Sequence, residues 1–314
     1  MGRTSWTEVP TALRARIESA LGGPVVQARS QSSGWSPGSA DRVITADGRR
    51  AFVKTVARSR NGDSADMHRR EARVMAAIPP EVQAPRLIAA FDEAHDGDEW
   101  VALVLDDVDG RHPGGDGRGH DTAAVLDALD TLPRATGTLA TLPRMADELR
   151  GEFAAWERML AAGLAGEVPD DVRAAAGRFA AAARGAHLLV DGDHLVHADC
   201  RADNLMVDAD GLVWVVDWPW ASVGAHWLDP LTYLLDTLVR GEHDDVDRHL
   251  ATHPVFAGLD GSTVDAVLSA LAGLFLEKAA QPAPPAMPTI REFQRSEGIA
   301  AARWVLRRWA ATPR

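Results

Sequence analysis

Three oxygen-bearing side chains in the second half of the chain have a spacing that could support chemistry. Asp199 and Asn204 lie five residues apart in the segment HADCRADN, residues 197–204, and Asp217 follows thirteen residues after Asn204. Phosphoryl transfer from ATP needs a carboxylate to orient the acceptor hydroxyl, oxygen ligands for Mg²⁺, and a cation on the phosphates. The three residues provide one candidate base and two candidate metal ligands.

A predicted hairpin connects two of these residues. The apolar runs 205–207 and 213–216 are separated by Asp-Ala-Asp-Gly, a sequence typical of a turn between two strands. Asn204 directly precedes the first strand and Asp217 directly follows the second, so we expect the two to come together. The alternative is that Asp and Asn in a turn only bind their own backbone, as such residues usually do. The joint spacing argues against that alternative.

A candidate cation lies far upstream. Lys54 belongs to the run 51–56, which otherwise reads as a buried strand, and Glu71 lies on the apolar face of the helical pattern that follows. Neither charge should be buried without a partner, so we expect Lys54 and Glu71 to pair. The alternative is a solvated surface pair, which contributes little.

Together these residues resemble the aminoglycoside phosphotransferase family within the protein-kinase-like fold. The loop of that family reads His-x-Asp-(x)4-Asn, and it is followed by a strand that ends in Asp. The resemblance implies Asp199 as the catalytic base and Asn204 and Asp217 as Mg²⁺ ligands. It also implies that Lys54 contacts the α- and β-phosphates of ATP and that Glu71 holds this lysine.

The same resemblance places two further parts of a nucleotide site. Residues 32–38 lack a full G-x-G-x-x-G but look like the short Gly-x-Ser-Pro loop of antibiotic kinases, so Gly34 and Ser36 are expected near the β-phosphate. The hinge is expected at the end of a strand, where the Asp106 carbonyl and the Val108 amide would bind adenine.

The elements around these residues indicate two lobes of different composition. The first third is strand-rich, with two strands flanking an Asp-Gly turn, a further strand at 100–105, and helices at 9–21 and 67–78. From about residue 121 the chain is rich in Ala and Leu, with helical spacing at 144–162, 168–186, 227–240, 262–278 and 289–311.

We therefore expect an α+β, bilobal protein-kinase-like fold. Its N-terminal nucleotide-binding lobe, residues 1–109, would contain an antiparallel sheet. The larger and mainly helical lobe, residues 110–314, would carry catalysis and substrate binding, with the boundary near Gly110.

The composition limits the partners. The 314 residues carry a formal net charge of −12, which argues against a nucleic-acid partner and suits a cationic substrate, although an acidic surface also serves solubility. The single cysteine, Cys200, and the absence of a basic segment followed by an apolar signal core predict a cytoplasmic protein. The apolar runs are too short to cross a membrane, which needs roughly 20 apolar residues. The oligomeric state stays open.

The acceptor is expected to be a small molecule that carries a hydroxyl group. Asp229 resembles the helix-start Asp that supports the family's catalytic loop, and only twelve residues separate it from Asp217. A protein kinase needs a longer segment there to dock a peptide. The short segment favours a small molecule over a peptide, and the resemblance together with the acidic charge implies an aminoglycoside-like antibiotic, an amino sugar or an amino alcohol. A catalytically inactive ATP-binding protein of the same fold is the alternative, although each transfer residue is present.

Several large side chains are candidates for the acceptor pocket or, equally, for packing. They are Trp218, Trp220, Trp227, Glu292, Glu297, Arg303 and Trp304.

Overall fold

The protein forms two compact units. The computed structural model describes residues 4–31, 38–114, 121–164, 167–241, 245–284 and 287–311. The first unit comprises Met1–Pro113 and Asp203–Ala221, and the second comprises Gly114–Ala202 and Ser222–Arg314. The functional boundary predicted near Gly110, between lobes 1–109 and 110–314, stays a prediction. None of the helices in the described ranges is long and apolar enough to cross a membrane.

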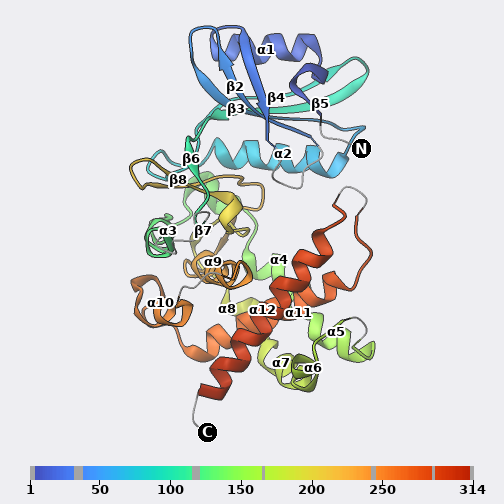
Figure 1. Ribbon diagram of the computed structural model, residues 1–314, viewed down its shortest axis with the longest axis vertical. Helices are drawn as coiled ribbons and strands as arrows, with labels where there is room; N and C mark the ends of the chain where they lie inside the picture. Colours follow the sequence, from blue (N-terminus) through green and yellow to red (C-terminus); the bar gives the residue numbers. More distant parts are fainter. Residues whose placement is uncertain are drawn as a thin grey trace. The chain divides into compact units, whose positions relative to one another are not determined.

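The first unit is built around a sheet of five antiparallel strands in the order β1-β2-β3-β5-β4 (Figure 1). Its elements are η1 (Trp6–Glu8), α1 (Thr11–Leu21), β1 (Val25–Ser30), β2 (Ser39–Thr45), β3 (Arg50–Ala57), α2 (Gly62–Met75), β4 (Leu87–His95), β5 (Asp98–Asp106), β6 (Gly110–Arg111), β8 (Leu205–Asp208) and β9 (Val213–Val215). A short turn of helix, η3 (Ala202–Asn204), lies where the chain passes from the second unit into the first.

The predicted hairpin at the Asp-Gly turn is present as β2 and β3. Ile44 lies opposite Arg50, and Gly48 adopts a φ of 86° in the turn between the strands, a conformation that glycine reaches without steric cost. The sequence analysis did not identify β4. This strand lies at the edge of the sheet and alternates between half-buried and exposed residues, so it lacks a strong apolar run.

The two faces of this sheet have different partners. On one face, α1 packs Leu13, Ile17 and Leu21 against buried strand residues such as Val53 and Val104. On the other face lies α2, so the two helices cover opposite sides of the sheet, as Figure 1 shows. Successive strand residues point to opposite faces. Lys54, the neighbour of Val53, therefore points toward α2.

Helix α2 begins earlier than the predicted helix at 67–78. It starts at Gly62, because the side chain of Asn61 accepts a hydrogen bond from the Ser64 amide at 2.8 Å and caps the first turn. The polar residues before Met67 form the first turns of the helix rather than a loop. Five more residues, about one and a half turns of helix, therefore precede the predicted start.

A second, smaller sheet of the first unit, in the order β6-β8-β9, contains the predicted hairpin at 205–216. Leu205 pairs with Val215 and Val207 pairs with Val213. Gly110 brings β6 close to β8, because a Cβ atom there would lie 2.6 Å from the Val207 carbonyl oxygen. The hairpin places Asn204 at its start and Asp217 just after its end.

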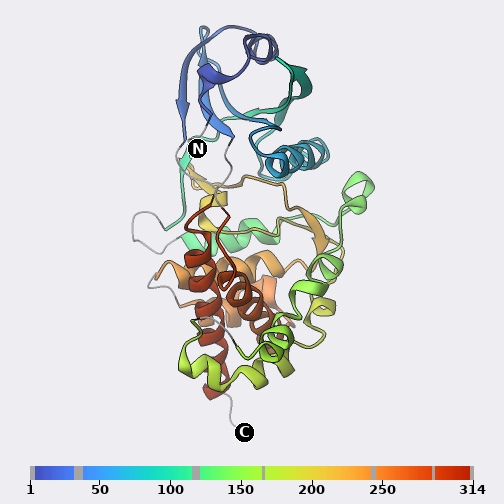
Figure 2. The same cartoon turned by 90° about the vertical axis from the view of Figure 1, so that its right-hand side faces the viewer.

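The second unit is mainly helical, as predicted. Its elements are α3 (Asp121–Asp130), η2 (Gly137–Thr141), α4 (Met145–Glu152), α5 (Ala155–Ala161), α6 (Asp170–Ala174), α7 (Ala176–Ala183), α8 (Ala186–Leu189), β7 (His194–Val196), β10 (Ser222–Gly224), α9 (Leu228–Val239), α10 (Val246–Thr252), η4 (Pro254–Phe256), α11 (Gly261–Ala279) and α12 (Ile290–Ala311). The two longest of these helices, α11 and α12, pack side by side (Figure 2).

Candidate active site

The first unit brings two carboxylates together around one lysine ammonium group. Lys54 on β3 donates to both carboxylate oxygens of Glu71 on α2, at 2.7 and 2.9 Å, and to Oδ1 of Asp217 at 2.8 Å. Glu71 is buried with 2% of its side chain exposed, whereas 46% of the Asp217 side chain is exposed. The expected pairing of Lys54 and Glu71 is thus present, and Asp217 joins it.

The electrostatics of this cluster keep the lysine charged. Burial by itself lowers the pKa of Lys54, but the carboxylates of Asp217 and Glu71 outweigh burial and raise the pKa above its usual value. His68, one turn before Glu71 on α2, responds in the opposite way: burial and the Lys54 charge lower its pKa to about 4. One ammonium and two carboxylates leave the cluster with a net negative charge, which favours a further cation.

Asn204 lies next to Asp217 through the backbone. The Asn204 carbonyl oxygen accepts from the amide of Val216 at 2.9 Å, and the Asn204 side chain is buried. Asp217 itself has a φ of 66°, which is uncommon for a residue other than glycine. Such a conformation persists only where the surroundings hold it, and it occurs often at functional sites. The two predicted metal ligands therefore belong to one local structure.

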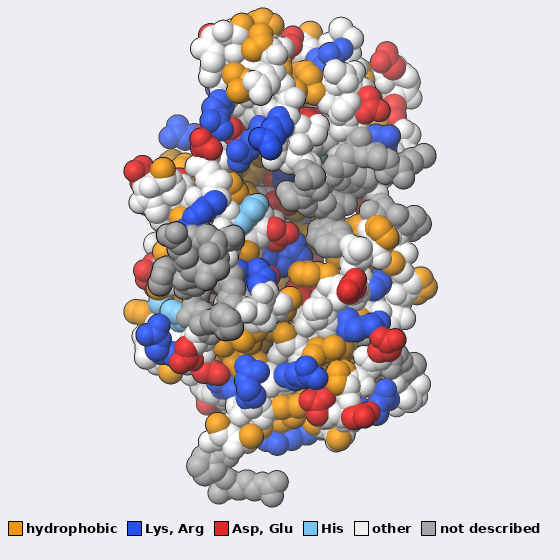
Figure 3. All heavy atoms as spheres, viewed as in Figure 1, with side chains coloured by type: hydrophobic (Ala, Val, Ile, Leu, Met, Phe, Trp, Pro, Cys, Tyr) orange, Lys and Arg blue, Asp and Glu red, His pale blue; other side chains and the backbone are white. Residues whose placement is uncertain are grey.

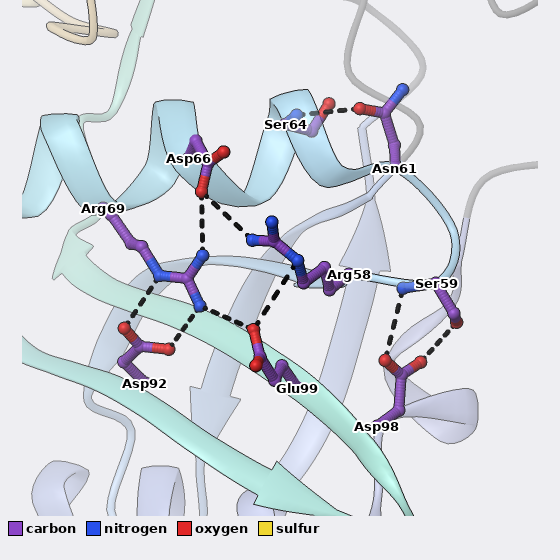
Figure 4. A network of polar contacts seen from close by, with 9 residues as sticks. All are labelled: Arg58, Ser59, Asn61, Ser64, Asp66, Arg69, Asp92, Asp98 and Glu99. Carbon is purple, nitrogen blue, oxygen red and sulfur yellow. Dashed lines mark hydrogen bonds and ion pairs between the residues drawn. The ribbon is translucent and has the colours of Figure 1, made fainter.

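A network of ion pairs between α2 and the strands β4 and β5 ties this helix to the sheet (Figure 4). Arg69 makes two parallel hydrogen bonds of 2.8 Å to the carboxylate of Asp92 on β4. It also contacts Asp66 at 2.8 Å and Glu99 on β5 at 3.2 Å. These contacts, with Asp92 first, raise the pKa of Arg69. Arg69 and Glu71 are two residues apart and so lie on opposite sides of the helix. The network therefore holds α2 where Glu71 reaches Lys54.

The predicted hinge residues follow the end of β5. Asp106 is the last residue of that strand, its carboxylate accepts from the Arg86 amide at 3.3 Å, and the Val108 carbonyl accepts from Arg42 at 2.8 Å. The neighbouring Asp107 forms ion pairs with Arg42 and Arg50. These contacts fix the backbone around Val108. Gly34 and Ser36 lie outside the described residues.

The loop that contains Asp199 belongs to the second unit. Asp229, at the start of α9, accepts from the amides of His197 at 2.5 Å and of Ala198 at 2.9 Å. Burial raises the pKa of Asp229, and His197 and these amides oppose that effect. Ala198 has a φ of 65°, again uncommon for a residue with a side chain. Asp229 therefore supports the loop, as the resemblance implied.

The Asp199 side chain is accessible and lies beside a cation. One third of it, 33%, is exposed, and Arg201 Nη2 lies 3.6 Å from Asp199 Oδ2. The Arg201 guanidinium lies 5.0 Å from the ring centroid of Phe293 on α12. The N-terminal part of α12 is thus close to the candidate base.

The structure separates the candidates for the acceptor pocket. Trp218 and Trp304 are fully buried and donate to Val215 and Asp247, so both serve packing. Trp227 is also buried. Trp220 is 43% exposed, and the Arg70 guanidinium lies 5.8 Å from its ring centroid.

On α12, the remaining candidates differ in the same way. Arg303 pairs with Asp171. Glu292 is exposed and Glu297 is half-buried, on the helix that carries Phe293.

Two features of the site escaped the sequence analysis. The Arg69 network joins residues of α2, β4 and β5, and its side chains read as ordinary surface charges. Asp236 on α9 accepts from the Ala202 amide at 3.0 Å. A signal for Asp236 did exist, because it lies seven residues after Asp229 within an otherwise apolar helical pattern.

Comparison with known families gives a match over most of the chain. The model of the phosphotransferase enzyme family matches residues 31–266. Among proteins of curated function, no sequence matches the chain.

Solved structures share the fold at low sequence identity. Aminoglycoside phosphotransferase APH(4)-Ia, as a thermostable mutant with ADP and hygromycin B, is 16% identical with a TM-score of 0.59, over 96% of this chain and 100% of that one. Choline kinase LicA from Streptococcus pneumoniae is 12% identical with a TM-score of 0.57, over 93% and 98%. Macrolide 2'-phosphotransferase MphH from Brachybacterium faecium is 16% identical with a TM-score of 0.57, over 91% and 97%.

At these identities the likeness shows the fold, and the predicted protein-kinase-like α+β class is confirmed. Because the family model also spans most of the sequence, the chain belongs to the phosphotransferase enzyme family and is a small-molecule phosphotransferase.

Proposed function

We propose that the chain transfers the γ-phosphate of ATP to a hydroxyl group of a small molecule. The observation that carries the proposal is the contact of Lys54 with Glu71 and Asp217 inside one unit, next to Asn204. A buried ammonium held by one carboxylate, beside a second and more exposed carboxylate, suits a bound polyphosphate and its metal ion.

Lys54 is assigned to the phosphates. Its raised pKa keeps it cationic, and Glu71 holds it from the buried side. When a nucleotide binds, Lys54 would exchange its contact with Asp217 for phosphate oxygens. The Asp217 carboxylate, with nearly half of its side chain exposed, would then be free to bind a metal.

Asn204 and Asp217 are assigned to Mg²⁺. A carboxylate and an amide provide the oxygen donors that Mg²⁺ prefers, and the net negative charge of the cluster suits a cation. The ion would neutralise charge on the phosphate oxygens.

Asp199 is assigned as the base. Its carboxylate would orient the acceptor hydroxyl and take the proton as the hydroxyl oxygen bonds to the γ-phosphorus and the bond to the β-phosphate oxygen breaks. Its partial exposure leaves room for an acceptor. The exchange produces a phosphate ester and ADP.

The adenine is assigned to the backbone of Asp106 and Val108. Within the described chain, the Val108 amide donates no hydrogen bond while its carbonyl is taken by Arg42, which suits the amide as the adenine donor. Gly34 and Ser36 remain proposed phosphate contacts.

The acceptor is proposed to be a cationic small molecule, such as an aminoglycoside-like antibiotic, an amino sugar or an amino alcohol. Structures of similar fold contain hygromycin B or are named for macrolide and choline substrates. The net charge of −12 would favour a cation. Trp220 offers an exposed aromatic ring for such a group.

The surface favours this acceptor over a nucleic acid. On the face drawn in Figure 3, Lys and Arg side chains are interspersed with Asp and Glu rather than gathered into one stripe. A nucleic-acid partner usually requires such a stripe. A cytoplasmic location, where ATP and Mg²⁺ are supplied, completes the proposal.

An acceptor screen tests the function. Purified protein is incubated with ATP, Mg²⁺ and panels of aminoglycosides, macrolides, amino sugars and amino alcohols, and products are read by mass. We expect at least one acceptor to gain one phosphoryl group. ATP binding without turnover across the panels would instead support an inactive ATP-binding protein.

Asp199→Asn provides the matched control for the screen. The amide keeps the shape of the side chain but cannot take the hydroxyl proton, so we expect transfer to be lost while nucleotide binding is retained. Turnover at the wild-type rate in this variant would contradict the assignment of Asp199 as the base.

A further inference from the structure

We propose that Asp236 is a positioning residue for phosphoryl transfer, which holds the far end of the loop that carries Asp199. The inference rests on the proposed function in one respect: it takes Asp199 as the base and Asn204 as a metal ligand. It adds a residue to which neither the sequence motif nor the resemblance assigned a role.

The contacts of Asp236 point at the loop. Its Oδ2 atom accepts from the Ala202 amide at 3.0 Å and from Nε of Arg240 at 2.8 Å. Asp236 is buried, with 7% exposed. A buried carboxylate is costly unless hydrogen bonds and an opposite charge compensate it, and here a backbone amide and a guanidinium do so.

Asp236 and Asp229 act on the same loop from one helix. Seven residues separate them on α9, so they lie on the same face and about 10.5 Å apart along the axis. Asp229 holds the amides of His197 and Ala198, and Asp236 holds that of Ala202. The loop therefore runs alongside α9 in the same direction, and Asp199 is fixed on both sides.

The neighbouring residues of α9 show that a buried carboxylate at position 236 lowers stability relative to an apolar residue. Leu231, Leu234 and Leu235 of the same helix are all buried. An apolar residue at position 236 would extend that packing without the desolvation of a charge. The hydrogen bond from the loop and the pair with Arg240 both compensate for an acid here, and the hydrogen bond from the loop is why we assign Asp236 to positioning.

The position of the Ala202 amide affects both the candidate base and a candidate metal ligand. Ala202 begins η3, the turn that ends at Asn204, and it lies three residues after Asp199. A shift of this amide would move the candidate base on one side and the candidate metal ligand on the other. A misplacement of about 1 Å can lower a rate by roughly 100-fold.

Asp236→Asn tests the proposal by two independent measurements. The amide weakens the acceptor and removes the charge that pairs with Arg240. In hydrogen exchange, we expect faster exchange in peptides that cover residues 199–204. In kinetics, we expect kcat to fall by about 10- to 100-fold, with the Kd for ATP near its wild-type value.

Asp260→Ala is the matched control. Asp260 caps the first turn of α11, where its carboxylate accepts from the Ser262 amide at 3.2 Å. Its loss should lower the stability of the second unit by about 1 kcal/mol without changing kcat or exchange at the loop. A parallel fall of kcat in both variants would reduce Asp236 to a structural role and overturn the proposal.

Two further outcomes are decisive. Unchanged exchange at residues 199–204, or an unchanged kcat, would overturn the role of Asp236.

If Asp236→Asn does not fold, Arg240→Gln replaces it, because Arg240 contacts the same oxygen from a partly exposed position and should give a smaller change in the same direction. A wild-type protein that phosphorylates no acceptor would refute the proposed function, while exchange would still decide whether Asp236 holds the loop.

Discussion

At the scale of single residues, the site depends on charges that compensate one another. Lys54 lies in a strand whose neighbours are buried, and it is tolerated there because Glu71 and Asp217 surround its ammonium group. Asp217 and Ala198 both adopt a positive φ without being glycine. Each of them directly adjoins or forms part of the proposed catalytic machinery, as expected for backbone that is held in place for function.

Removing the ammonium group tests its role directly. We expect Lys54→Ala to lower kcat/KM for ATP by about 100-fold or more, because a preorganised positive group is lost from the phosphates. The variant should also be less stable, since Glu71 stays buried without its partner. Steady-state kinetics and urea denaturation measure the two effects.

Lys278, the other lysine in the sequence, is the control for this experiment. It pairs with Glu152 at 3.2 Å on a partly exposed surface. Lys278→Ala should leave both kinetics and stability near wild type. An unchanged kcat/KM for ATP in Lys54→Ala would show that Lys54, like Lys278, has no role in the use of ATP.

His68 predicts a dependence of stability on pH. Its pKa is about 4 in the folded chain, through burial and the Lys54 charge, against about 6.5 in the unfolded chain. Between these values the unfolded chain binds the proton and the folded chain does not. The contribution is therefore complete above pH 6.5 and is lost as the pH falls toward 4.

From these values, about 2 kcal/mol of the stability should be lost through His68 between pH 7.5 and pH 5. Urea denaturation of the wild type and of His68→Gln at both pH values isolates this contribution from those of the carboxylates. The variant should lose about 2 kcal/mol less than the wild type. Equal losses in the two proteins would contradict the depressed pKa.

At the scale of elements, two helices position the site in different ways. Helix α2 carries Glu71 on one side, and on the opposite side Arg69 ties it to β4 and β5. Helix α9 reaches the Asp199 loop directly through Asp229 and Asp236. In both helices the apolar residues pack against the rest of the unit, and a few polar residues hold the site residues in place.

The Arg69 network should be sensitive to salt. Arg69→Ala removes contacts to three carboxylates that are more than half exposed, so we expect a loss of only about 1 kcal/mol at low salt and less at 1 M NaCl. We also expect a higher KM for ATP, because Glu71 is held less firmly. Denaturation and kinetics at two ionic strengths measure these effects.

Arg150→Ala is the control for the network. Arg150 forms a single pair with Asp147 in which both side chains are 65% exposed. Its loss should change neither quantity. An effect of Arg69→Ala no larger than that of Arg150→Ala would show that the network does not position α2.

At the scale of the whole molecule, the chain combines two compact units in one phosphotransferase. The first unit contains the proposed nucleotide and metal residues, including the segment Asp203–Ala221 that arrives from the far half of the sequence. The second contains Asp199 and its supports. A ligand that binds the folded state and not the unfolded state stabilises the folded protein.

We therefore expect ATP with Mg²⁺ to raise the Tm of the wild type. At a nucleotide concentration about 100 times Kd the stabilisation is about 2.7 kcal/mol. Chelation of Mg²⁺ should remove most of the shift, and Lys54→Ala should show little of it. A shift that is the same with and without the chelator would argue against a metal held by Asn204 and Asp217.

Several parts of the site were predictable because their signals are local. The hairpin at 205–216 places Asn204 and Asp217 through a turn sequence alone, and the strand around Lys54 identifies a charge that needs a partner. Helix α1 followed from a spacing of four residues and its flanking Pro10 and Gly22. The start of α2 and strand β4 did not follow, because a cap and an edge strand depend on few, weakly apolar residues.

By itself the sequence determined the family: the identity and spacing of Asp199, Asn204 and Asp217, with an upstream lysine and glutamate, predicted the phosphotransferase family whose model matches the chain. Only the tertiary structure decided which charges meet. The contact of Lys54 with Asp217 joins residues 163 positions apart, and the hydrogen bond from Ala202 to Asp236 spans 34. Periodicity records neighbours along a strand or helix, whereas such contacts arise only when packing brings distant elements together.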